Sequence, residues 1–116
     1  MSPLERSGAV RHWHFLTNHS HVLVCLMSNP EARIRDVASA VGITERAAVR
    51  IVNELEDAGF VVRHRAGRRN WYEFTLERPL RHPLEAACSV SDLLEPILNA
   101  RARTRTGRAG GRHNGR

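Results

Sequence analysis

Residues 37–61 read VASAVGITERAAVRIVNELEDAGFV, and this stretch decides the fold of the chain of 116 residues. Its second half predicts a helix over about residues 44–58. Thr44 is a favourable N-cap, and Gly59 offers a C-terminal stop. Apolar residues recur at positions i, i+3, i+4 and i+7, which is the spacing of one buried helix face. They are Ala48, Ile51, Val52 and Leu55.

A shorter helix is predicted just before it, from about residue 36 to 41, with Ile34 as a possible short strand in front. Two crossing helices need a small residue at their contact, a turn residue that tolerates positive φ, and an apolar residue that plugs the turn. Ala38, Gly42 and Ile43 supply these in that order. The spacing therefore predicts a helix-turn-helix.

The flanking segments extend this unit on both sides. An apolar stripe predicts a helix over about residues 18–28, which Asn29-Pro30 ends. Residues 60–76 contain two β-prone runs around the turn Ala66-Gly67-Arg68-Arg69, which predicts a β-hairpin. The expected fold class is thus mainly α with a small β-hairpin, that is, α+β.

The C-terminal third predicts one more helix, followed by a tail. Ser89 is a candidate cap with Asp92 three residues on, and Pro96 is expected to kink or shorten the helix. Residues 101–116 have no large apolar side chain and are expected to be disordered. The apolar stripe of this helix is Val90, Leu93, Leu94, Ile97 and Leu98.

Charge is distributed unevenly along the chain. The formal net charge is +6, and residues 101–116 hold six arginines and no acid. Residues 1–100 hold twelve arginines and twelve acids, so the body is formally neutral. The basic excess therefore belongs to the tail, where counterion release from nucleic acid would add non-specific affinity.

Several classes of protein are disfavoured by the sequence. The longest apolar run, residues 22–27, is too short to span a bilayer, and no signal pattern opens the chain, so we expect a cytoplasmic protein without membrane contact. No phosphate loop, nucleophile elbow or paired-carboxylate motif is present, so we expect neither an enzyme nor a cofactor. Four histidines lie in residues 12–21, but too few acids or cysteines accompany them to predict a metal site.

Residues 37–61, and more widely residues 19–78, resemble the winged helix-turn-helix regulators of the MarR and ArsR type. The ending Leu55-Glu56-Asp57-Ala58-Gly59-Phe60-Val61 is especially similar to their junction between recognition helix and wing. The resemblance implies a DNA-binding domain over residues 18–78. It would be preceded by an N-terminal arm, 1–17, and followed by a helical dimerisation segment, 79–100, and the basic tail, 101–116.

The resemblance also implies which residues contact double-stranded DNA. The exposed face of the second helix would lie in the major groove, where arginine can bond guanine, asparagine adenine and glutamate cytosine. This face, with its cap, comprises Thr44, Glu45, Arg46, Val49, Arg50 and Asn53. The hairpin would act as a wing that lies along phosphates or enters the minor groove. Its candidate contacts are Arg63, Arg65, Arg68, Arg69 and Asn70.

Regulators of this kind usually dimerise, so that two helices reach successive grooves. The C-terminal stripe named above is the predicted dimer surface, with packing onto its own domain as the alternative. The leading interpretation is a sequence-specific homodimeric transcription regulator, which we expect to be a repressor. An architectural nucleoid protein and a winged-helix adaptor for protein or RNA remain alternatives. The sequence does not identify a small-molecule effector; one would have to bind between the DNA-binding unit and the dimer helices.

Overall fold

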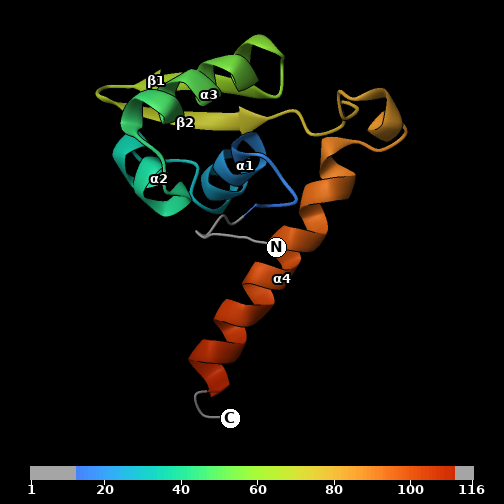
Figure 1. Ribbon diagram of the computed structural model, residues 1–116. Coiled ribbons are helices and arrows are strands. Elements are labelled where there is room, and N and C mark those ends of the chain that lie inside the picture. The colour runs from blue at the N-terminus through green and yellow to red at the C-terminus, as the bar shows by residue number, and fades with distance from the viewer. Residues whose placement is uncertain (1–12, 112–116) are drawn as a thin grey trace, which may run out of the picture.

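The computed structural model describes residues 13–111, and their side chains up to residue 104. Most of the predicted N-terminal arm and the end of the tail lie outside these residues. The elements follow the predicted order: helices α1 (Asn18–Ser28), α2 (Ile34–Val41) and α3 (Glu45–Asp57), then strands β1 (Val61–Ala66) and β2 (Arg69–Phe74), and finally helix α4 (Val90–Gly111) (Figure 1). The predicted mixed fold, mainly helical with one hairpin, is confirmed.

The helix-turn-helix forms because its turn residues have the required backbone conformation. Gly42 has φ +87°, and the amides of Gly42 and Ile43 both bond the carbonyl of Ala38, at 2.8 and 3.0 Å. This pairing closes α2 and redirects the chain into α3. Ile34, considered as a possible strand, is instead the first residue of α2.

The hairpin forms around the predicted turn. The strands pair antiparallel from Val61 opposite Phe74 to Ala66 opposite Arg69, which leaves Gly67 and Arg68 as a two-residue loop. Gly67 has φ +64°, as the first central position of such hairpin turns requires. Tyr72 points into the core, and its neighbours on the strand face outward.

One core joins the three short helices, the hairpin and the start of α4. Each of these parts contributes buried side chains to the core. Ile43, in the turn between α2 and α3, is partly buried and packs against it. The largest fully buried side chains are Val22, Leu26, Val37, Val52, Val61 and Leu94. The core therefore fixes the position of α3 from behind and leaves its opposite face exposed.

Helix α4 is longer than the sequence predicted. It begins with a capping box, in which the Ser89 amide donates to Asp92 Oδ2 at 2.9 Å and the Asp92 amide donates to Ser89 Oγ at 3.0 Å. It runs through Pro96 to Gly111 and leads away from the rest of the chain (Figure 1). The expected disorder from residue 101 is thus wrong as far as residue 111. Alanine and arginine are strong helix formers even where nothing is buried, and arginines near a helix C-terminus complement its dipole. Residues 112–116 lie outside the described part.

None of the helices described between residues 13 and 111 is both long and apolar enough to cross a membrane.

Candidate nucleic-acid interface

Helix α3 presents one face to the core and the opposite face to solvent. Ala48, Ile51 and Val52 are at most 2% exposed. Thr44 caps the helix, because its Oγ1 accepts a hydrogen bond from the Ala47 amide at 3.0 Å. All six residues predicted for the recognition surface are exposed; they are Thr44, Glu45, Arg46, Val49, Arg50 and Asn53.

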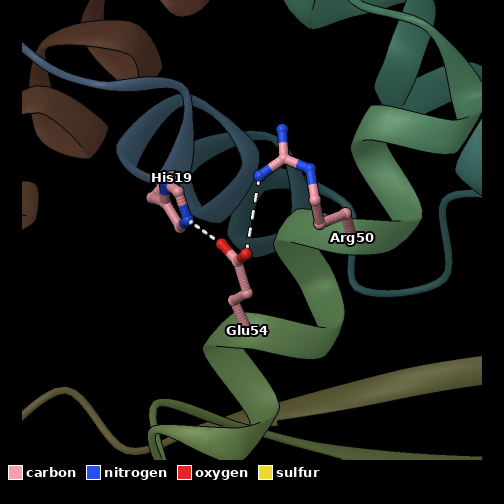
Figure 2. A network of polar contacts seen from close by, with 3 residues as sticks. All are labelled: His19, Arg50 and Glu54. Carbon is pink, nitrogen blue, oxygen red and sulfur yellow. Dashed lines mark hydrogen bonds and ion pairs between the residues drawn. The ribbon is translucent and has the colours of Figure 1, made fainter.

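Arg50 belongs to a polar network that joins α3 to α1. Glu54, one turn further along α3, accepts a hydrogen bond from His19 Nε2 on its Oε1 at 2.7 Å (Figure 2). Its other oxygen lies 3.5 Å from Nη1 of Arg50. The hydrogen bond from His19 is the main cause that lowers the pKa of the Glu54 carboxyl below its usual value, and the charge of Arg50 lowers it further.

A second polar cluster joins α3 to the hairpin. Nη2 of Arg63 donates to Asn53 Oδ1 at 2.6 Å and to Glu56 Oε1 at 2.8 Å. The Arg63 side chain is only 29% exposed, and its Nε is buried without a partner. Asn53 and Arg63 were both predicted to contact DNA, and the structure brings them into contact with each other. Arg63 therefore ties the wing to the recognition helix.

The remaining wing arginines lie at or near the turn. Arg65 donates to the Gly67 carbonyl at 3.3 Å, and Arg69 donates to the Glu31 carbonyl at 3.2 Å. Arg68 is exposed in the turn and makes no hydrogen bond to another described residue. The Asn70 side chain is half-buried, with an Oδ1 that has no partner. The hairpin thus presents an arginine-rich tip beside the exposed face of α3.

The predicted dimer stripe divides into two groups. Val90 and Leu94 are 5% and 0% exposed within the single chain, so they belong to its own core. Leu93, Ile97 and Leu98 pack against that core and stay partly exposed. Only the second group is available to a partner.

A cavity of about 730 Å³ lies next to this stripe, between α1, the end of α3 and α4. Its walls are mostly apolar, with His19 and Glu54 among the polar lining residues. Across the described residues, no three histidine, cysteine or acidic side chains gather in a way that could hold a metal ion.

Sequence reasoning missed His19, Glu54 and Glu56 as parts of the site. The spacing of four residues between Arg50 and Glu54 is a recognisable signal for an ion pair on one helix. The contacts of His19 and Glu56 had no such signal, because each joins segments that meet only in the folded chain.

Comparison with known proteins covers the same region. A family model described as the MarR family matches residues 16–69, from α1 to the wing turn. The chain is similar to MepR, a transcription regulator of the Staphylococcus aureus multidrug efflux pump MepA, with 16% identity and a TM-score of 0.48, over 83% of this chain and 67% of MepR. It is also similar to the MarR family transcriptional regulator SPO1453 from Silicibacter pomeroyi DSS-3, with 24% identity and a TM-score of 0.46, over 80% of this chain and 60% of SPO1453.

The chain thus spans about two thirds or less of the length of these two proteins. No curated protein matches the sequence. The family match and the helix-turn-helix geometry coincide on the same residues. Residues 16–69 are therefore similar to the MarR family over the stretch that forms the helix-turn-helix and the first strand of the hairpin.

Proposed function

We propose that the protein is a homodimeric, sequence-specific repressor that reads double-stranded DNA with α3 and holds it with the wing. One observation carries this proposal: Ala48 and Ile51 of α3 are at most 2% exposed, while Arg46 and Arg50 are exposed on its other face. An exposed helix face of this kind can enter the major groove, where arginine donates two hydrogen bonds to guanine.

The wing supplies phosphate contacts in this proposal. The α3 unit carries acids as well as arginines, so it attracts a polyanion only weakly by itself. Arg65 and Arg68 extend from the hairpin without an ion-pair partner among the described side chains. They are free to neutralise phosphates or to enter a narrow minor groove.

Dimerisation would place two such units on successive grooves. Three observations favour α4 and its surroundings as the contact surface. Leu93, Ile97 and Leu98 are partly exposed, Leu84 in the preceding connector is 90% exposed, and α4 projects beyond the core (Figure 1). Two bound subunits covering a promoter would block access to it, which is the basis for proposing repression.

The decisive experiment is selection of bound duplexes from a randomised DNA pool, followed by affinity measurements at near-physiological salt. A regulator should enrich one motif and bind it at least about 10³-fold more tightly than scrambled DNA. Arg50→Ala should lose discrimination at one base pair of each half-site. Arg81→Ala, a change of the same charge in the connector, is the matched control and should keep the motif.

Two results would contradict the proposal. Equal affinity for selected and scrambled DNA would indicate an architectural protein, and no binding to either would indicate an adaptor for another kind of partner. Repression itself is tested by placing the selected motif in a reporter promoter. Expression should fall when the protein is produced, and it should not fall with Arg50→Ala.

A further inference from the structure

The contact between His19 and Glu54 is the only described side-chain hydrogen bond that links α1 to the recognition helix. The two residues are 35 positions apart, and the 2.7 Å between Nε2 of His19 and Oε1 of Glu54 is at the short end of the range for hydrogen bonds from nitrogen to oxygen. Both side chains are partly exposed, at 41% and 48%. The contact is not part of the buried core, so its effect depends on the second contact of Glu54, which is with Arg50.

Glu54 has two oxygens, and they serve different partners. His19 holds Oε1, and this bond fixes the carboxylate so that Oε2 is directed at Nη1 of Arg50 (Figure 2). An exposed arginine–glutamate pair of spacing i, i+4 is weak by itself, and glutamate on the C-terminal side is the less favourable order. A carboxylate that is already held in place loses less freedom when it binds Arg50.

Arg50 keeps donors for DNA while it contacts Glu54. A guanidinium has five N–H donors in a planar fork, and only Nη1 is directed at the carboxylate. The remaining donors can still form a pair of bonds with guanine. Restraining this long side chain before DNA arrives reduces the free energy that its ordering would cost on binding.

We propose that His19 is a positioning residue for base recognition, which acts on Arg50 through Glu54. It contacts no base itself. This inference rests on the proposed function, because it requires Arg50 to read a base pair. Its effect should be confined to the base pair that Arg50 contacts, since the network restrains no other residue of the recognition surface.

The test compares His19→Ala, His19→Gln, Arg50→Ala and the double variant His19→Ala/Arg50→Ala in the full chain. Glutamine can place an amide N–H near the position of Nε2 and should keep the bond. Affinities are measured for the selected motif and for all its single base-pair substitutions. His19→Ala should reduce discrimination by about 2- to 10-fold at the Arg50 base pair, the range expected for ordering one long side chain. His19→Gln should restore most of it.

The double variant separates positioning from general destabilisation. In the Arg50→Ala background, removal of His19 should have no further effect on discrimination, because the coupled partner is already gone. A uniform loss of affinity over all base pairs, in both backgrounds, would overturn the inference. Full discrimination in His19→Ala, alongside a clear loss in Arg50→Ala, would overturn it and leave the proposed function intact. Full discrimination in Arg50→Ala would contradict both.

Discussion

Arg63 and Arg68 lie in the same hairpin, yet the structure predicts different consequences when each is replaced by alanine. Arg63 donates to Asn53 and Glu56 and is mostly buried. Hydrogen bonds to charged groups contribute about 1.5–3 kcal/mol, and solvent around Glu56 places this cluster near the lower end. Arg63→Ala should therefore reduce the free energy of unfolding by about 1–2 kcal/mol and the Tm by at least about 4 °C.

Arg68 should show the opposite behaviour. It is exposed in the turn, so Arg68→Ala should leave the free energy of unfolding within about 0.5 kcal/mol of the parent. Loss of one phosphate contact should instead reduce the slope of log K against log salt by about 0.9. Over a fourfold rise in salt, that slope difference corresponds to a change of about 3.5-fold in relative affinity.

The assays are urea denaturation followed by circular dichroism, and fluorescence anisotropy on one duplex at four salt concentrations. The two variants remove the same charge from neighbouring parts of the wing, so each is the control for the other. If Arg63→Ala lowered the salt slope by a full unit and kept its stability, then Arg63 would contact phosphate and its assignment to the α3–wing junction would be refuted.

Four further predictions concern the helices. Thr44→Ala should cost about 1 kcal/mol of stability, and Thr44→Ser should recover most of it, as measured by urea denaturation; equal stability of the two variants would show that the cap contributes nothing. Leu94→Ala should cost about 2–5 kcal/mol even in dilute solution, because Leu94 is 0% exposed in the single chain. Leu98→Asp should mainly shift the protein from dimer to monomer, which sedimentation can measure; an unchanged dimer would exclude this part of α4 as the interface. Because the hydrogen bond from His19 lowers the pKa of Glu54, this carboxylate stabilises the folded state above its unfolded pKa, and the contribution is lost as pH falls through the lowered value. Glu54→Gln should abolish that loss in denaturation curves taken between about pH 6 and pH 3, and an unchanged pH profile would argue against it.

The elements with strong local patterns could be predicted from the sequence. The apolar stripe of residues 44–58, the glycine at 42 and the two-residue turn at 67 and 68 each specify a conformation through nearby residues alone, and each is confirmed. The predicted exposed face of α3 follows directly from that stripe, since opposite faces of one helix are set by the same period.

The remaining features depend on contacts between distant segments or on competing preferences. The sequence offered Arg63 and Asn53 as separate DNA contacts, and nothing local showed that they would bond each other. The C-terminal tail combined a composition typical of disorder with strong helix formers, and the second property prevails up to residue 111 because the helix is already nucleated in the core.

The unbroken course of α4 has a geometric consequence for the proposed dimer. Its first turns are anchored in the core by Val90 and Leu94, and its last turns extend outward with no loop between them. Subunits joined along this helix would hold their two recognition helices at a fixed distance and in a fixed relative rotation. Inserting a single base pair between half-sites turns one of them by about 35° around the duplex axis. A dimer with this rigid connection would tolerate little variation in the number of base pairs between the two half-sites.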